Sequence, residues 1–160
     1  MAVTRDDRIV VGVDGSDHSR RALAWALEEA RRRGTGCLLV HAFEFGVVAA
    51  SPYAGRAFEQ IRIAAQGLLD EDVAFARECG VVVEGRLVSG SPAQALIEAS
   101  RDASMLVVGS HGRGGLAGMV LGSVSTDCVH HAHCPVVVIP PPEHGRGEAA
   151  PAPDGHALAR

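Results

Sequence analysis

Short, nearly continuous apolar runs alternate along this chain with longer segments in which apolar residues recur at helical spacing. The apolar runs occupy residues 8–14, 37–43, 81–88, 105–108 and 135–139, and they are rich in Val, Ile and Leu. Continuous runs of this kind are typical of strands that are covered on both faces of a parallel sheet. The pattern therefore predicts five buried strands.

Four amphipathic helices are expected between these strands, because each intervening segment carries an apolar stripe at the i, i+3, i+4 spacing. Ser16 or Asp17 can cap the first helix, which ends at Gly34. The pattern Ser91-Pro92-Ala93-Gln94 resembles a capping box with proline at the first helical position. The predicted helices span about 17–33, 56–79, 92–99 and 123–132.

Strands that alternate with helices predict an α/β fold: an open five-stranded parallel sheet with helices on both faces. We expect the strand order 3-2-1-4-5, in which the chain reverses direction between strands one and four. Ligands bind such sheets at the carboxyl ends of the strands, at the point of reversal. Asp14-Gly15-Ser16 and the glycine-rich segment from Gly109 follow these two strands. Their coincidence predicts a ligand site there.

The glycine-rich segment 109–123 has features of an anion-binding loop. Gly109 and Gly112 allow a sharp turn off strand four without an obstructing Cβ, and N–H groups across 112–115 can form an anion-binding concavity. The last helix begins at Gly122-Ser123, where unpaired N–H groups and the hydroxyls of Ser123 and Ser125 favour a phosphate. The segment is not a Walker A loop, because the chain contains no lysine.

The spacing of these glycines resembles a known family. Two residues separate Gly109 from Gly112, and nine separate Gly112 from Gly122-Ser123. This spacing is similar to the ATP-binding signature of the universal stress protein family. Four further segments resemble that family in the same order along the chain, and the resemblance spans residues 8–139. These segments are residues 11–16, 40–41, 90–92 and 134–139.

The resemblance implies a Rossmann-like fold, similar to the adenine nucleotide alpha hydrolases, that binds ATP at the reversal point. Asp14 would hydrogen-bond the ribose or adenine side, and the backbone of Ala42, where a valine is commoner, would meet the adenine edge. The glycine and serine positions of the signature would hold ribose and phosphates. The nucleotide-binding residues expected on this basis are Gly12, Val13, Asp14, Ala42, Gly109, Ser110, Gly112, Arg113, Gly122, Ser123, Val124 and Ser125.

Cofactor and partner expectations follow from the same resemblance. Mg²⁺ would accompany ATP through water and phosphate oxygens, because no dedicated carboxylate pair is visible in the sequence. Cyclic AMP or AMP is the alternative ligand. The resemblance also implies a homodimer, whose interface would cover the apolar edge of the fifth strand. The residues of that edge are Val136, Val137, Val138 and Ile139.

Composition limits the remaining possibilities. The 160 residues are 47% hydrophobic and carry a net charge of −4, so they suit a globular domain and show no basic footprint for nucleic acid. Neither a signal-peptide core nor an apolar run of roughly 18 residues is present, so we expect a cytoplasmic protein without membrane contact. Residues 1–140 form the expected domain. Residues 141–160, rich in Pro, Gly and Ala, are expected to be a disordered tail.

Each candidate feature also has a plainer interpretation. Asp14-Gly15-Ser16 can be only a strand end with a helix cap, and the glycine segment only a flexible loop. Arg113 is typical of a solvated loop charge, and His111 of a polar loop residue rather than a catalytic base. The segment 128–134 contains two Cys and three His but lacks the spacing of a zinc site. His41 is expected to be a packed strand residue.

The function favoured by these features is a nucleotide-dependent regulatory binding module of the stress response. At most slow ATP hydrolysis is expected, because no general base, arginine finger or lysine is recognisably directed at a γ-phosphate. We therefore assign no catalytic residue and no metal ligand. Two alternatives remain open: a nucleotide hydrolase that uses the same pocket, and a nucleotide-free dimeric interaction scaffold.

Overall fold

The computed structural model describes residues 7–46, 54–112 and 121–142. Its five strands are parallel and lie in the order β3-β2-β1-β4-β5, which confirms the order expected from the sequence. In chain order the elements are β1 (Ile9–Gly12), α1 (Asp17–Arg33), β2 (Cys37–Phe43), α2 (Ala54–Glu78), β3 (Val83–Ser89), α3 (Pro92–Ala99), η3 (Ser100–Asp102), β4 (Met105–Gly109), α4 (Ser123–His131) and β5 (Val136–Ile139).

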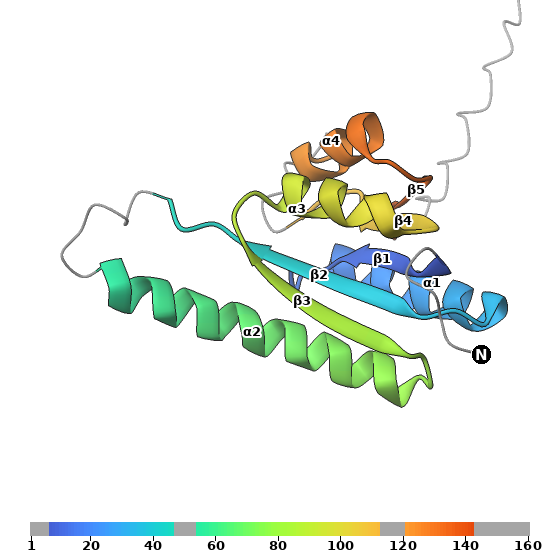
Figure 1. Cartoon of the computed structure of the whole chain (residues 1–160), viewed down its shortest axis with the longest axis horizontal. Helices are drawn as coiled ribbons and strands as arrows, with labels where there is room; N and C mark the ends of the chain where they lie inside the picture. Colours follow the sequence, from blue (N-terminus) through green and yellow to red (C-terminus); the bar gives the residue numbers. More distant parts are fainter. Residues whose placement is uncertain (1–6, 47–53, 113–120, 143–160) are drawn as a thin grey trace, which may run out of the picture.

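The sheet is sandwiched between two pairs of helices (Figure 1). Alternate side chains of each central strand point to opposite faces, so Ile9 and Val11 pack with α1 and α2, whereas Val10 packs with α3 and α4. All three are at most 1% exposed. Both faces of the central strands are therefore core, which explains why the sequence there is continuously apolar.

The ends of α1 follow the cap chemistry of its sequence. The Ser16 hydroxyl accepts a hydrogen bond from the Ser19 N–H at 3.2 Å, and Gly34 ends the helix in the left-handed conformation with φ 66°. The capping box expected at α3 is wrong in part. Ser91 is the N-cap and Pro92 opens the helix, but the Ser91 side chain makes no capping hydrogen bond.

Several element boundaries differ from the prediction by one or two residues. β1 ends at Gly12 because the next residues already enter the turn before α1. β3 begins at Val83, since the N–H of Val81 still bonds to the Ala76 carbonyl near the end of α2. α2 begins at residue 54, two residues earlier than predicted. No helix in the described parts of the chain combines the length and apolarity that crossing a bilayer requires.

Candidate functional site

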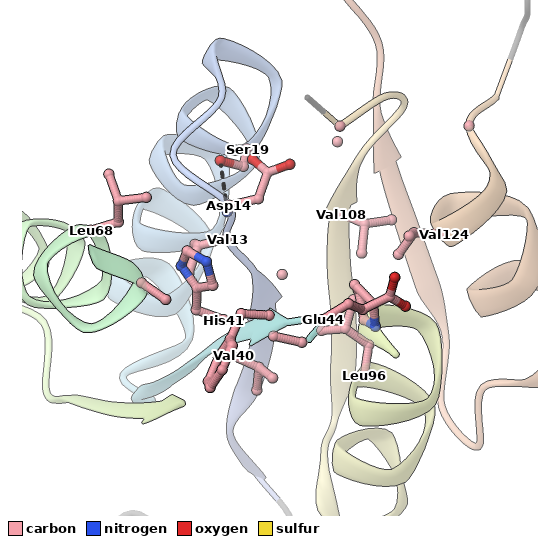
Figure 2. A pocket seen from close by; sticks show the side chains of 18 of the residues that line it. Val13, Asp14, Ser19, Val40, His41, Glu44, Leu68, Leu96, Val108 and Val124 are labelled. Carbon is pink, nitrogen blue, oxygen red and sulfur yellow. Dashed lines mark hydrogen bonds between the residues drawn. The ribbon is translucent and has the colours of Figure 1, made fainter. Parts of the chain in front are cut away.

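A cavity of about 820 Å³ opens at the carboxyl edge of the sheet, where β1 and β4 lie side by side. From β1 the chain continues towards β2 and β3, and β4 and β5 lie on the other side, so this edge is the reversal point. Figure 2 shows Leu68 on one side of the cavity, with Leu96, Val108 and Val124 on the other. The volume falls within the range of small-molecule sites, about 300 to 1,000 Å³.

A tight turn at the end of β1 positions Asp14 on the cavity wall. The Ser16 N–H donates to Asp14 Oδ1 at 2.9 Å, and Gly15 between them has φ 76°, a conformation that favours glycine. The Asp14 N–H donates to the Ser19 hydroxyl at 3.3 Å, as the dashed line in Figure 2 shows. Both bonds hold the Asp14 carboxylate in one place at the start of α1.

Gly109 and Gly112 matter here because other parts of the protein approach them closely. A Cβ on Gly109 would lie 2.9 Å from the carbonyl carbon and oxygen of His18, and a Cβ on Gly112 would lie 2.9 Å from Asp14 Oδ2. Neither glycine has a positive φ. The sharp turn predicted at these glycines therefore does not use the left-handed conformation. Their missing side chains instead let the end of β4 pack against the turn that follows β1.

Ser110 connects three parts of the site. Its N–H donates to the carbonyl of Ile139 in β5 at 2.9 Å, and its own carbonyl accepts from the Gly122 N–H at 2.7 Å. The buried Ser125 hydroxyl lies 3.0 Å from the carbonyls of both Ser110 and Gly122, so it donates within the protein. Ser125 thereby ties the start of α4 to Ser110, and its expected contact with a phosphate stays a prediction.

The N-terminus of α4 opens beside this network. Gly122 is the N-cap and has no side chain to cap the first turn, while Ser123 and Val124 line the cavity. The first N–H groups of a helix lack intrahelical partners and carry the positive end of its dipole. This end of the cavity is therefore suited to an anion.

Much of the remaining cavity wall is apolar. Ile61, Ala64 and Leu68 of α2 face Pro92 and Leu96 of α3 across it. Gly12 lies beside Leu96, and a Cβ on Gly12 would come within 3.0 Å of the Leu96 Cδ1. Apolar walls together with bare backbone at the start of α4 suit a ligand with a flat apolar part and an anionic part.

The structure brings together most of the residues predicted from the sequence. Ser110 lies directly behind the wall, and Arg113 is outside the described residues. Sequence reasoning missed His41, Glu44, Ile61, Leu68 and Leu96, although the apolar stripe of α2 contained Ile61 and Leu68. The predicted residues that line the cavity are Gly12, Val13, Asp14, Ala42, Gly109, Gly112, Gly122, Ser123, Val124 and Ser125.

Burial changes the pKa values of one aspartate and two cysteines near the core. Burial raises the pKa of the Asp72 carboxyl in α2, an effect that Arg20 opposes and the negative charges of Glu71 and Asp14 reinforce. Burial also raises the pKa of the Cys37 thiol to about 12 and that of Cys128 to about 11. These cysteines are protonated at neutral pH and behave as small core side chains. Among the described residues, no group of three or more His, Cys, Asp or Glu could hold a metal ion.

Comparison with known proteins shows which proteins this chain resembles. The family model described as the universal stress protein family matches residues 7–140. A universal stress protein of Mycobacterium tuberculosis is 42% identical over 132 residues, which are 81% of this chain but 44% of that relative. The chain thus spans less than half the length of this curated relative.

Two solved structures are also similar over most of the chain. A universal stress protein from Archaeoglobus fulgidus, solved in complex with dAMP, is 31% identical with a TM-score of 0.65 and covers 83% of this chain and 97% of its own. A second universal stress protein, solved in complex with cAMP, is 28% identical with a TM-score of 0.65 and covers 83% and 96%.

Proposed function

Because this chain belongs to the universal stress protein family, we propose that its cavity binds an adenine nucleotide and that the bound state is read by partner proteins. ATP is the proposed ligand, with cyclic AMP and AMP as alternatives. The regulatory output is a shift in population: the nucleotide favours one arrangement of the cavity wall where β4 ends and α4 begins. The protein acts as a binding module rather than as an enzyme with a dedicated reaction.

The observation that carries this proposal is the combination of apolar walls and an uncapped helix start in one cavity. The apolar walls of α2 and α3 suit an adenine ring, and the uncapped start of α4 suits phosphates. The relatives solved with dAMP and with cAMP support the same ligand class. In this arrangement the Ala42 backbone meets the adenine edge and Asp14 the ribose.

Mg²⁺ is proposed to enter with the nucleotide. The donor set favours this route, because Asp14 and Glu44 are the only carboxylates among the described residues that line the cavity. Mg²⁺ commonly keeps several waters and binds through substrate phosphates. Hydrolysis is proposed to be slow, since phosphoryl transfer needs positioned cations and the described lining residues include no arginine.

A homodimer through β5 is the second part of the proposal. Glu84 and Arg86 mark the other edge strand, β3, with exposed charges, whereas all four residues of β5 are half-buried aliphatics. An apolar edge strand is a ready surface for pairing with another chain. The hydrogen bond from Ser110 to Ile139 joins this edge directly to the cavity wall. Nucleotide and partner can therefore influence the same strand end.

Titration calorimetry tests the ligand. Wild-type protein is titrated with ATP, AMP, cyclic AMP and adenosine, beside the Gly112→Val and Gly67→Val variants. Gly112 lies directly against Asp14 on the cavity wall, whereas a Cβ on Gly67 in α2 meets nothing within 4 Å. We expect Gly112→Val to weaken nucleotide binding at least about tenfold and Gly67→Val to leave it unchanged. Absence of binding by every ligand at millimolar concentration would favour the scaffold alternative.

Multiple turnovers of ATP on a timescale of seconds would favour the hydrolase alternative instead.

Sedimentation of the full chain over a dilution series tests the dimer. Val138→Pro removes one N–H from the β5 edge, and Arg86→Ala alters the opposite edge. We expect the first substitution to dissociate the dimer and the second to preserve it, with circular dichroism as the check on folding.

A further inference from the structure

The described residues that line the cavity carry few groups that can be cationic. Its described lining residues include the carboxyl groups of Asp14 and Glu44 but no arginine, and the chain contains no lysine. Among these residues, only the imidazoles of His41 and His111 can carry a positive charge. Imidazoles gain and lose their proton within the physiological range of pH.

The two imidazoles lie in different parts of the cavity. His41 is a buried β2 residue next to Ala42, and Figure 2 shows its ring near Val13. His111 immediately precedes Gly112 in the loop after β4. A Cβ on Gly122, the N-cap of α4, would lie 3.5 Å from the His111 Cα. His111 therefore stands at the end of the cavity that suits an anion.

Two neighbours hold the His111 ring. The Ser110 hydroxyl lies 3.1 Å from His111 Nδ1, and because a hydroxyl both donates and accepts, it can serve the neutral and the protonated imidazole equally. The ring of His18 lies 5.5 Å from that of His111, centroid to centroid, at an angle of 52°. The Nδ1 atom of His18 is buried with no hydrogen-bond partner among the described residues.

The charged groups around the two imidazoles differ. His18 is the second residue of α1, where the positive end of the helix dipole disfavours a cation, and it shares a surface hollow with Arg20 and Arg21. Asp17, the residue before His18, lies in the same hollow. His111 instead shares the cavity with Asp14 and Glu44. The His18 ring packs against that of His111 in a tilted arrangement.

We propose that His111 is the residue that recognises phosphate in this cavity, pairing as a protonated imidazole with the phosphate of the bound nucleotide. His18 is its positioning residue, which holds the ring through the packed face. This inference rests on the proposed nucleotide binding, and it predicts that the affinity for the nucleotide depends on pH. As pH rises and His111 loses its proton, the advantage of a nucleotide over the uncharged nucleoside declines.

The test uses calorimetry from pH 5.5 to 8.0 to compare the affinity for cyclic AMP with the affinity for adenosine. All variants keep Glu44 and Asp14. Cyclic AMP is the reference because its diester carries one fixed charge, whereas the terminal phosphate of ATP itself titrates near pH 6. The variants are His111→Gln and, as the matched control, His130→Gln, an exposed imidazole near the far end of α4.

In wild type and in His130→Gln, we expect the ratio of cyclic AMP to adenosine affinity to fall about tenfold from pH 5.5 to 8.0. In His111→Gln the ratio should be low and constant. A ratio that is constant in wild type, or that still falls in His111→Gln, overturns the role of His111 while leaving nucleotide binding intact. Failure of both ligands to bind wild type overturns the proposed function, and this inference with it.

Two further variants test the positioning role of His18. His18→Phe keeps an aromatic face against His111, and His18→Ala removes it; neither changes the backbone contact with Gly109. We expect His18→Phe to retain the pH dependence of the ratio, and His18→Ala to lower the ratio severalfold at pH 5.5 only. A purely structural role would weaken adenosine and cyclic AMP equally at every pH, and that result would exclude positioning.

Discussion

The backbone of His18 lies directly against Gly109, where an added Cβ would come within 2.9 Å of the His18 carbonyl carbon. This contact joins the first turn of α1 to the end of β4. The neighbouring approach of Gly112 to Asp14 closes the same gap one step further along the loop. The shape of the cavity at the reversal point therefore depends on two missing side chains.

Replacing Gly109 by alanine should destabilise the protein. The new methyl group meets backbone atoms of His18, which cannot move aside as the end of a flexible side chain would. We expect a loss of about 1 to 3 kcal/mol in the free energy of unfolding, measured with urea. Gly67→Ala, in the middle of α2 with open space around it, should instead gain up to about 1 kcal/mol. Equal effects at the two positions would refute the close-packing explanation.

Gly15 should tolerate asparagine better than valine. Its φ of 76° lies in the left-handed region, which asparagine visits more readily than β-branched residues do. We expect Gly15→Val to cost about 1 to 2 kcal/mol and Gly15→Asn clearly less, by thermal unfolding. Gly15→Val should also weaken nucleotide binding, because the turn holds the Asp14 carboxylate through the Ser16 N–H. Equal stability of the two variants would contradict this assignment.

Ser125→Ala should loosen the contact between Ser110 and the start of α4 without disturbing the sheet. The buried hydroxyl lies 3.0 Å from the carbonyls of Ser110 and Gly122, and its loss removes one buried hydrogen bond. We expect about 1 kcal/mol of destabilisation in urea. Hydrogen exchange should increase at Gly122, whose N–H also bonds to Ser110, and remain unchanged in β1. Faster exchange throughout the sheet would show that Ser125 supports the whole fold instead.

Asp72→Asn should stabilise the protein at neutral pH. Burial raises the pKa of the Asp72 carboxyl above that in the unfolded chain, despite the nearby Arg20, and its Oδ2 has no hydrogen-bond partner among the described residues. A raised pKa means that the carboxyl contributes most below its unfolded value, about 3.9, and that this contribution is lost as pH rises through the folded value. We expect a gain of about 1 kcal/mol at pH 7, which disappears towards pH 3.5.

The matched control for this prediction is Asp70→Asn. Asp70 is exposed on the same helix and accepts a hydrogen bond from Gln66 at 2.8 Å. Unfolding curves at several pH values should show little difference between this variant and wild type. A gain of the same size and pH dependence at Asp70 would mean that the effect reflects net charge rather than burial.

The central strands could be predicted from the sequence because burial on both faces demands an unbroken apolar run. Val10 and Val11 pack on opposite faces and are both fully buried. The edge strand β3 was placed less well. It is half exposed, and Gly85 within it makes room for Val73 and Leu69 of α2 rather than following any strand pattern. Such a contact depends on a partner far away in the sequence.

What the sequence by itself determined was the local chemistry: which segments form strands and helices, and which turns lack side chains. Those features depend on residues close together in the chain. Only the tertiary structure decided which groups meet across the reversal point. His18 and His111 are far apart in the sequence, and their rings meet because β1 and β4 are neighbours in the sheet. The apolar wall contributed by α2 likewise depends on how that helix packs against β2 and β3.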